Sequence, residues 1–356
     1  MSETTRSLSA RARKLSMDVK PAAGTALTSR WLAGRAFRPL LKGALGLFAS
    51  AMLFMPVTVQ AAAPMAKTNP PGFYRVMLGR FEVTALSDGT APGFNLQQLL
   101  TNTSSKAITT ALERESLSDP VEGSVNAFLI NTGSRLVLVD AGAGKLFGPT
   151  LGRLQDSLRA SGYRPEQVDD IIIAHLHPDH AGGLASAGQA VFPNAQLHID
   201  QREAAYWLSP ANLNAAPPAN KDFFKGAMSS VEPYVRAGRL KTFDDGAEIT
   251  PGVRVRSAPG HTIGHSLVVV ESEGRKLLLW GDLVHAAALQ FSRPEVTIAY
   301  DTGSAEAAAQ RWKIFEEAAR EGYLVGAAHV SFPGLGHVSP EGPAYRWTPA
   351  PYGVLR

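Results

Sequence analysis

Cysteine is absent from the 356-residue sequence, and charged residues make up only 19% of it. Without cysteine the chain can have no disulfide framework, no thiolate metal ligand and no cysteine nucleophile. The low charge content excludes a coiled coil or an acidic tail, and the glycines lack the three-residue period of collagen. The remaining composition, with 45% hydrophobic residues, is that of an ordinary globular protein.

The excess of positive charge, +4 overall, is confined to the start of the chain. Residues 1–61 contain nine basic and two acidic side chains and carry 9 − 2 = +7, so residues 62–356 carry 4 − 7 = −3. A protein that binds nucleic acid needs a basic surface for the phosphates. The sequence therefore does not favour nucleic acid as a partner.

The leader has the parts of a secretory signal peptide. A basic flank ending at Lys42 precedes an uncharged stretch, residues 43–63, with small residues at its end. We expect cleavage near Ala61 and a periplasmic or secreted protein, exported by the general route because no twin arginine is present. An uncleaved anchor is the alternative, since the stretch reaches the lower limit of a membrane span, and Met17 is a second candidate start. Membrane contact is expected only through this signal.

Residues 62–356 are predicted to form a single domain, because no linker, charge block or repeat divides them. Short β-rich runs occur at 80–86, 126–131, 135–139, 171–175, 196–199, 253–257, 266–270, 276–280 and 323–327. Helical stretches are expected at 151–160, 202–208, 223–237 and 305–321. Strands in two halves with helices outside them predict an α/β sandwich in which one sheet packs on another.

Two segments are predicted to be irregular, and one tryptophan is assigned to the core. Residues 93–117 and 209–221 are predicted to be irregular insertions. In the last helical stretch, apolar residues including Trp312 and Phe315 recur at helical spacing. This pattern predicts that Trp312 lies in the core.

The strongest functional signal is a histidine-rich segment directly after an apolar run. It reads His175-Leu-His177-Pro178-Asp179-His180 and continues into two glycines. Alternate residues of a strand face the same side, so His175 and His177 can hold one cation. The turn forced by Pro178 and the glycines can then direct Asp179 and His180 toward a second cation.

Three further strand ends carry residues that such a site needs. The segment His261-Thr-Ile-Gly-His265 follows one predicted strand, Asp282 ends another, and His329 ends a third. A buried unpaired carboxylate is costly, so Asp282 suits a ligand that bridges two metals. Taken singly, Asp282 and His329 would be structural residues as often as ligands, and it is the order of all these motifs that makes them specific.

This order of motifs resembles the metallo-β-lactamase superfamily, over residues 73–337. The resemblance implies a four-layer αββα sandwich and two divalent metal ions in each chain. Zinc is the expected metal, and manganese, cobalt or iron would also suit the ligands. The implied ligands are His175, His177 and His261 for one metal, Asp179, His180 and His329 for the other, and Asp282 as the bridge.

The same resemblance implies roles for other polar residues. Asp140, at an earlier strand end, would support the site without binding metal. His265 would orient its neighbours and would not be a ligand. His198 and His337 are expected to have structural roles only.

Four stretches, residues 73–90, 146–154, 223–228 and 326–337, resemble the methyl parathion hydrolase group more closely. That group consists of exported binuclear hydrolases that act on aryl organophosphate triesters and on aryl esters or lactones. Its pocket is lined by aromatic residues, which correspond here to Phe147, Trp207 and one of Phe223 and Phe224. Each of these taken alone would be assigned to the core.

One stretch departs from the organophosphate-adapted pattern. His285 stands where we expect an apolar residue, and Ile298 and Tyr300 are bulkier than expected. An imidazole three residues after Asp282 suits a flat carbonyl substrate and would crowd a tetrahedral phosphotriester. The sequence therefore favours opening of lactones or cleavage of aryl esters, such as dihydrocoumarin, with phosphotriester hydrolysis as a side activity. A phosphotriesterase or an acyl-homoserine lactonase is the alternative.

By the same resemblance a metal-bridging hydroxide attacks the substrate, so no protein nucleophile is needed. Asp179 and Asp282 are the predicted catalytic residues, because they bind the metals and orient the attacking oxygen. The expected partner is a small ester, lactone or phosphotriester. Exposed aromatic residues around the pocket would also suit a homodimer.

These residues give less support to other functions. The bridging Asp282 argues against a true β-lactamase, whereas a glyoxalase-like thioesterase has the same ligands and stays open. From a different class, the chain could be a metal-binding module without turnover or a redox diiron protein. Redox members of the superfamily favour a carboxylate where His177 stands, and they usually carry a flavin domain that does not fit in this chain.

Overall fold

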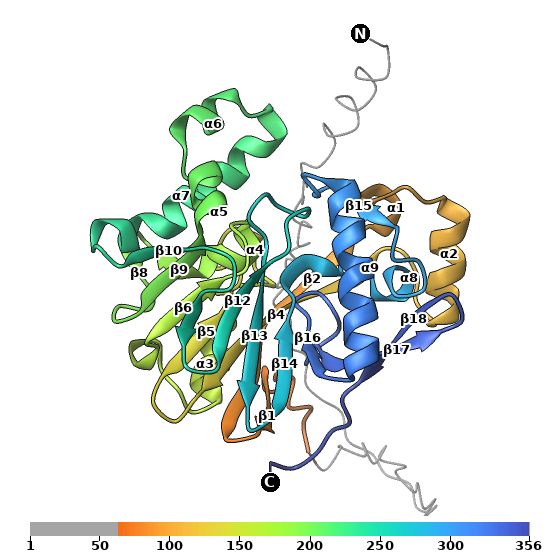
Figure 1. Ribbon diagram of the computed structural model, residues 1–356, viewed down its shortest axis with the longest axis horizontal. Helices are drawn as coiled ribbons and strands as arrows, with labels where there is room; N and C mark the ends of the chain where they lie inside the picture. The colour runs from red at the N-terminus through yellow and green to blue at the C-terminus, as the bar shows by residue number, and fades with distance from the viewer. Residues whose placement is uncertain (1–62, 356) are drawn as a thin grey trace, which may run out of the picture. The chain divides into compact units, whose positions relative to one another are not determined.

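Two seven-stranded sheets pack face to face in the computed structural model, which describes residues 63–355 (Figure 1). The first sheet has the order β1 (Phe73–Leu78), β2 (Phe81–Phe94), β4 (Val121–Asn131), β5 (Leu136–Val139), β6 (Asp170–Ile173), β9 (Gln196–Asp200) and β10 (Leu240–Phe243). The second has the order β11 (Glu248–Thr250), β12 (Val253–Ser257), β13 (Ser266–Ser272), β14 (Arg275–Leu279), β16 (Leu324–Gly326), β17 (Leu335–Glu341) and β18 (Ala344–Pro349). The predicted signal peptide, 1–61, lies outside the described residues.

Helices cover the outer face of each sheet. The first sheet is covered by α3 (Leu154–Ala160), α5 (Gln201–Trp207) and α7 (Lys221–Arg236), and the second by α9 (Ser304–Glu321). Figure 1 shows α5 and α7 on one side of the molecule and α9 on the other. The order of layers is helix, sheet, sheet, helix, which confirms the predicted αββα sandwich.

The continuous apolar runs are explained by burial of the first sheet on both faces. In β5, Leu138 points toward the outer helices, whereas Val137 and Val139 point into the space between the sheets. Its parallel neighbour β6 divides in the same way, with Ile171 outside and Ile172 between the sheets. Because successive side chains of a strand alternate, both faces of these strands must be apolar.

The two segments predicted to be irregular contain helices. Residues 93–117 include α1 (Leu96–Leu99), β3 (Leu100–Thr101) and α2 (Ser105–Arg114), and residues 209–221 include α6 (Pro210–Ala215). The side chains of Ser104 and Ser209 accept hydrogen bonds from the backbone N–H groups of Ala107 and Asn212, so both serines cap helices. The prediction was wrong because it weighed composition above these capping signals.

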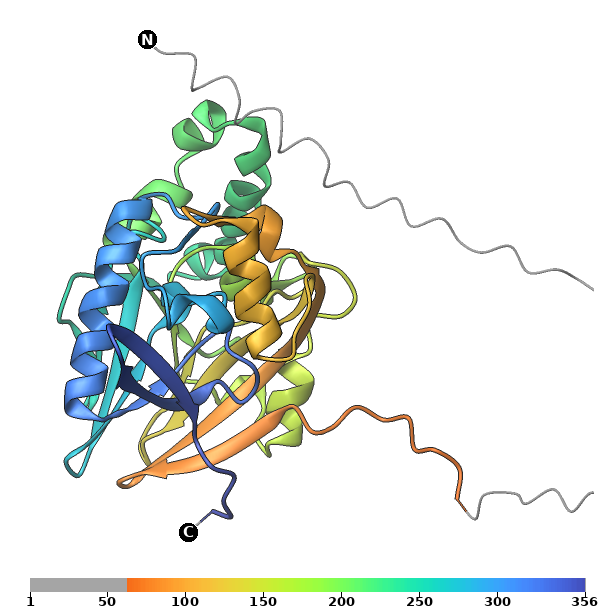
Figure 2. The same cartoon turned by 90° about the vertical axis from the view of Figure 1, so that its right-hand side faces the viewer.

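The first insertion packs as a small cluster beside the second sheet. Its helices α1 and α2 share a hydrophobic core with α8 (Ala287–Gln290) and β15 (Thr297–Ile298), and β15 pairs with β3. Figure 2 shows α2 and α9 from the side, with the short α8 between them. The cluster therefore packs against the chain segment that follows Asp282, residues 286–298, and stabilises it.

The prediction for Trp312 was also wrong. Its side chain is 37% exposed and packs edge-on against Tyr345, whereas the buried face of α9 carries Arg311, Ile314 and Phe315. The apolar pattern gave a face shifted by one residue because the buried Arg311 was counted as polar.

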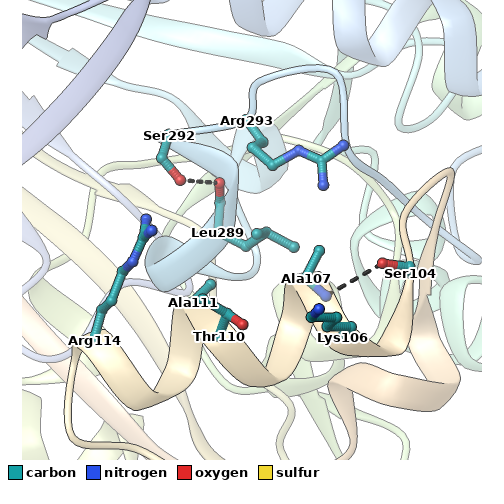
Figure 3. A pocket seen from close by; sticks show the side chains of 9 residues that line it. All are labelled: Ser104, Lys106, Ala107, Thr110, Ala111, Arg114, Leu289, Ser292 and Arg293. Atoms are coloured by element: carbon teal, nitrogen blue, oxygen red, sulfur yellow. Dashed lines mark hydrogen bonds between the residues drawn. The ribbon is translucent and has the colours of Figure 1, made fainter.

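A groove with a volume of about 410 Å³ lies between α2 and α8 (Figure 3). Its walls carry Lys106, Arg114 and Arg293 together with three hydroxyl groups, around a floor that includes Leu289. None of the predicted site residues lines it. Within residues 63–355, no helix is both long and apolar enough to cross a membrane.

Candidate metal centre

The functional motifs meet at one end of the sandwich, where strands from both sheets finish. The segment after β6 leads into α4 (Pro178–Ala181) and belongs to the first sheet. The loop after β12, the short helix η7 (Gly281–Leu283) after β14 and the loop after β16 belong to the second sheet. Residues that are distant in sequence thus become neighbours at the junction of the two sheets.

The structure brings together all seven residues predicted as ligands. They form two groups that share Asp282, and within each group one potential ligand atom per residue lies within 4.8 Å of the others. The first group consists of His175, His177, His261 and Asp282, and the second of Asp179, His180, Asp282 and His329.

Asp282 directs one carboxylate oxygen to each group. Its Oδ2 lies 3.2 Å from His261 Nε2 and 3.6 Å from His175 Nε2. Its Oδ1 lies 2.8 Å from His180 Nε2 and 3.0 Å from His329 Nε2. A carboxylate divided in this way between two histidine clusters has the arrangement of a bridging ligand.

The donor set fits two divalent cations. His175 is fully buried, and neither of its ring nitrogens has a hydrogen-bond partner among the described residues. A buried imidazole without a partner is costly unless its nitrogen binds something else. Five imidazoles and two carboxylates arranged in this way suit zinc and similar metals.

Two of the histidines are held in the neutral form. Burial, reinforced by neighbouring imidazoles, is the main reason that the pKa values of His175 and His177 lie well below the usual value. A neutral imidazole can offer a ring lone pair to a cation. These two side chains are therefore ready to bind metal without losing a proton.

Carboxylates have the opposite effect on the other ligand histidines. Burial by itself would lower the pKa of His261, but Asp282 and Asp301 outweigh it and raise the pKa to about 9. Nearby carboxylates likewise outweigh burial and raise the pKa of His180 and His329. The surrounding histidines in turn hold the pKa of Asp282 well below its usual value, against the effect of burial. Asp282 therefore keeps the negative charge that a bridging ligand needs.

Three of the ligand histidines are oriented through Nδ1. His180 donates to Asp140 Oδ2, His261 to Asp301 Oδ1 and His329 to the carbonyl of Ser124, each over 2.8 Å. These bonds leave Nε2 of each ring facing Asp282. Asp140 has the supporting position that the sequence predicted. Asp301 and Ser124 were missed, because no motif surrounds either residue.

His265 supports the bridging residue from behind. Its Nε2 accepts a hydrogen bond from the Asp282 backbone N–H at 3.1 Å, and its Nδ1 donates to the Ala258 carbonyl at 3.1 Å. A Cβ atom at Gly281 would lie 2.7 Å from this Nε2, so only glycine fits before Asp282. Both ring nitrogens of His265 are occupied, which agrees with an orienting role.

Residues 120–327, more than half of the chain, match the family model of the metallo-beta-lactamase superfamily. The chain belongs to the metallo-β-lactamase superfamily. It is 29% identical over 192 residues to a "probable metallo-hydrolase" of Mycobacterium tuberculosis, covering 45% of this chain and 59% of that protein. It is 29% identical over 127 residues to an N-acyl homoserine lactonase of Bacillus cereus, covering 36% of this chain and 42% of the lactonase. The chain thus spans about half the length of these curated relatives.

Two solved structures match this chain over nearly their whole length. One is described as hydrolase AbOPH, with 35% identity, a TM-score of 0.77 and coverage of 81% of this chain and 100% of that one. The other is AidC, a dizinc quorum-quenching lactonase in complex with a product, with 27% identity and a TM-score of 0.74, covering 80% of this chain and 99% of that one. The first supports the superfamily assignment.

His285 lies directly against Asp282, the carboxylate that the two groups share. Its Nε2 is 3.0 Å from Asp282 Oδ2, and its ring stacks on His329 with centroids 5.3 Å apart. Its Nδ1 is buried and has no hydrogen-bond partner among the described residues. Burial outweighs Asp282 and lowers the pKa of His285, so the ring is neutral. Its one N–H is donated from Nε2 to Asp282, which leaves Nδ1 as a hydrogen-bond acceptor.

Aromatic side chains border the three-histidine group. Trp207 lies edge-on to His177 with ring centroids 5.3 Å apart, and Phe223 lies 5.2 Å from the same ring. Tyr300 is 38% exposed, and the centroid of its ring lies 6.3 Å from that of Phe223. Phe147 is 45% exposed in the loop between β5 and α3. Phe223 and Tyr300 therefore form a partly exposed apolar border beside His177, whereas Trp207 is buried.

Three of the predicted pocket residues belong to the core. Trp207 is 3% exposed and packs on Phe224 in the core that the first sheet forms with its outer helices. Phe224 is 1% exposed and packs on Trp207 and Tyr206, so Phe223 and not Phe224 faces His177. Ile298 is also 1% exposed and packs in the cluster of α1, α2 and α8. Successive residues on a helix point in different directions, which the sequence pattern left unresolved for the two phenylalanines.

His198 and His337 lie away from the centre. His198 donates to Asp170 Oδ1 at 2.9 Å, and Asp170 also accepts bonds from Arg135. His337 donates to the carbonyl of Tyr323 at 3.1 Å. Both histidines therefore have structural partners in or directly beside the two sheets.

Proposed function

We propose that this protein is a binuclear, zinc-dependent hydrolase that opens lactones. The observation that carries the proposal is the division of Asp282 between two groups of ligands. Two bound cations would lower the pKa of an attacking water and polarise the substrate carbonyl. The N-acyl homoserine lactonase of Bacillus cereus and the dizinc lactonase AidC support this reaction class.

The substrate approaches from the side of Asp179 and His329. Their side chains are 20% and 12% exposed, whereas that of Asp282 is 3% exposed and that of His175 is fully buried. Asp179 Oδ2, 3.4 Å from His329 Nε2, is therefore the ligand carboxylate nearest solvent. We assign Asp179 to orienting the attacking water and Asp282 to holding the two halves of the centre together.

The preferred substrate is a lactone or aryl ester with a flat apolar part. The ring of Phe223 offers an apolar surface beside His177, next to the buried Trp207. His285 donates its Nε2–H to Asp282 Oδ2, so it would donate to the leaving oxygen only by giving up that bond. A neutral imidazole here also crowds the space that a tetrahedral phosphotriester would need. Phosphotriester hydrolysis, as in the methyl parathion hydrolase group, is the second candidate, and acyl-homoserine lactones are an alternative substrate class.

The first test measures metal and turnover together. Purified mature protein should contain close to two metals per chain and should hydrolyse dihydrocoumarin or phenyl acetate. Asp282→Ala should lose both bound metal and activity, because both groups depend on this residue. One metal or none after reconstitution with zinc, manganese and cobalt would contradict the proposal, as would a metal-loaded protein without hydrolytic activity.

The second test compares substrates. For wild type and His285→Leu, kcat/KM is measured on an aryl lactone, an acyl-homoserine lactone and a dimethyl aryl phosphotriester. We expect the wild type to prefer the aryl lactone, and the variant to lose lactonase activity by about 10-fold or more while its phosphotriesterase activity rises. A wild type that prefers the phosphotriester would reverse the ranking.

We also propose that the protein is exported and cleaved near Ala61, leaving residues 62–356 as one hydrolase domain that can form a homodimer. The basic flank and the uncharged stretch of residues 43–63 support export. N-terminal sequencing of the protein from a periplasmic fraction should begin close to Ala62. A full-length chain recovered from membranes would favour the anchor instead.

A further inference from the structure

A fully buried carboxylate lies outside the ligand set and joins two of its loops. Glu203, on α5, has no exposed surface. Its Oε1 accepts a hydrogen bond from the backbone N–H of Leu176 at 2.9 Å, and its Oε2 accepts one from Gly264 at 2.8 Å. Leu176 stands between His175 and His177, so one oxygen of Glu203 holds each histidine-bearing loop.

The second loop is seated directly on α5. A Cβ atom at Gly264 would lie 2.5 Å from the Glu203 nitrogen and 2.7 Å from its Cβ atom. Real Cβ atoms do not approach so closely, so the loop can reach Glu203 only because residue 264 is glycine. The glycine before His265 thus has a packing reason that involves the glutamate.

The connection acts most directly on one of the two ligand groups, because both bonded N–H groups lie next to residues of that group or in their loop, although the loop of Leu176 also continues to Asp179 and His180. Leu176 and Gly264 belong to the loops that carry His175, His177 and His261, and His261 Nε2 lies 3.1 Å from His177 Nδ1. The second group is supported elsewhere, through the bond of His180 to Asp140. Among the described residues, Glu203 forms no hydrogen bond with the segments that carry Asp282 or His329.

A buried carboxylate is costly unless it is paired or hydrogen-bonded. The two hydrogen bonds that Glu203 accepts from backbone N–H groups partly offset that cost. Their donors lie 27 and 61 residues away from Glu203 in the sequence. They also fix the spacing of the two loops before any metal binds. A ligand set whose spacing is fixed in advance loses less conformational freedom on binding.

We propose that Glu203 is a positioning residue that sets the metal affinity of the three-histidine group by fixing the distance between its two loops. The proposal rests on the two-metal assignment made above. The proposal concerns the metal-free protein and its affinity for metal, so metal binding tests it more directly than catalytic activity does.

The test uses Glu203→Gln, which keeps the shape of the side chain. The amide retains one acceptor oxygen, and its NH2 group opposes the second backbone N–H, so one of the two bonds is lost. We expect the zinc affinity of the three-histidine group to fall by about 10- to 100-fold. Competition with a chelator should resolve one weakened and one unchanged site, and the visible absorption of the cobalt-substituted protein should change for one ion only.

Asp200→Asn is the matched control. Asp200 caps the same helix and is 2% exposed, but its hydrogen bonds go to Arg202. Its replacement should lower the thermal stability of the metal-free protein and leave both zinc affinities within about twofold of wild type. Glu203→Asp, one methylene shorter, should weaken the same site as Glu203→Gln.

Gly264→Ala provides a second route if Glu203→Gln fails to fold. Its methyl group would push the loop away from Glu203, so the same site should weaken while the carboxylate remains. Two unchanged zinc affinities in Glu203→Gln or Gly264→Ala would overturn the proposal, as would equal weakening of both sites. A wild-type protein that binds fewer than two metals would instead contradict the proposed function.

Discussion

At the scale of single residues, Asp140 controls the side of the centre that Glu203 does not reach. Its Oδ2 accepts the Nδ1–H of His180, and its Oδ1 accepts the backbone N–H of Ala174, each over 2.8 Å. The residue has a left-handed backbone, with φ of 62°, which aspartate and asparagine tolerate better than most residues. Both oxygens are therefore in use, and the ring of His180 is held with Nε2 toward Asp282.

Asp140→Asn should weaken metal binding at the second ligand group. Asparagine keeps the backbone conformation but has one acceptor oxygen, so either His180 or Ala174 faces an NH2 group. We expect zinc affinity at the site of Asp179, His180 and His329 to fall by about 10- to 100-fold, measured by chelator competition. The exposed Asp156→Asn on α3 serves as the control, and equal affinities in the two variants would refute the role of Asp140.

At the scale of elements, α9 holds two chain segments together through the buried guanidinium group of Arg311. Arg311 is 1% exposed and donates to the carbonyls of Leu283, Pro294 and Val296 over 2.6 to 2.7 Å. Burial lowers its pKa to about 10, so it is still charged at neutral pH. Leu283 follows Asp282 directly, so the helix fixes the end of η7 to the chain that leads into β15.

Arg311→Met should destabilise the fold by roughly 2 kcal/mol or more, because the carbonyls of Leu283 and Pro294 lose the guanidinium at about 1 kcal/mol or more each, whereas that of Val296 still accepts from Gln290. Urea denaturation monitored by circular dichroism would measure the change in the free energy of unfolding. Lys313→Met, at an exposed position of the same helix, is the control. If both variants unfold at the same urea concentration, the three bonds do not contribute as the structure indicates.

At the scale of the whole molecule, the centre joins the two sheets. His175, His177, Asp179 and His180 come from the end of the first sheet, whereas His261, Asp282 and His329 come from the second. Each ligand group therefore contains residues of both sheets. A bound cation would connect the halves of the sandwich at the end where their strands finish.

Removal of metal should consequently lower global stability. A ligand that binds only the folded state adds about 4 kcal/mol when its free concentration is 1,000 times its dissociation constant. The melting temperature should fall on treatment with EDTA and return on addition of zinc but not magnesium, which prefers oxygen ligands. Asp282→Ala should respond much less to EDTA. An identical melting temperature with and without metal would contradict the link between the sheets.

Much of the fold was predictable from the sequence, since most apolar runs became strands and all four helical stretches became helices. The main errors lie where polar residues decide structure. Serine caps formed α2 and α6 in segments that composition marked as irregular, and the buried Arg311 shifted the inner face of α9. Patterns of apolar residues do not reveal helix caps or buried charged side chains.

The sequence alone was enough to place His175, His177, Asp179 and His180 in one motif after an apolar run, and the resemblance of the motif order to the metallo-β-lactamase superfamily supplied the other three residues that meet at the centre. Only the tertiary structure decided what surrounds them. Asp301 reaches His261 across 40 residues, and Glu203 reaches Gly264 across 61. Nothing near Asp301 or Glu203 in the chain indicates these partners, because hydrogen bonds between distant loops depend on how the two sheets pack and not on local spacing.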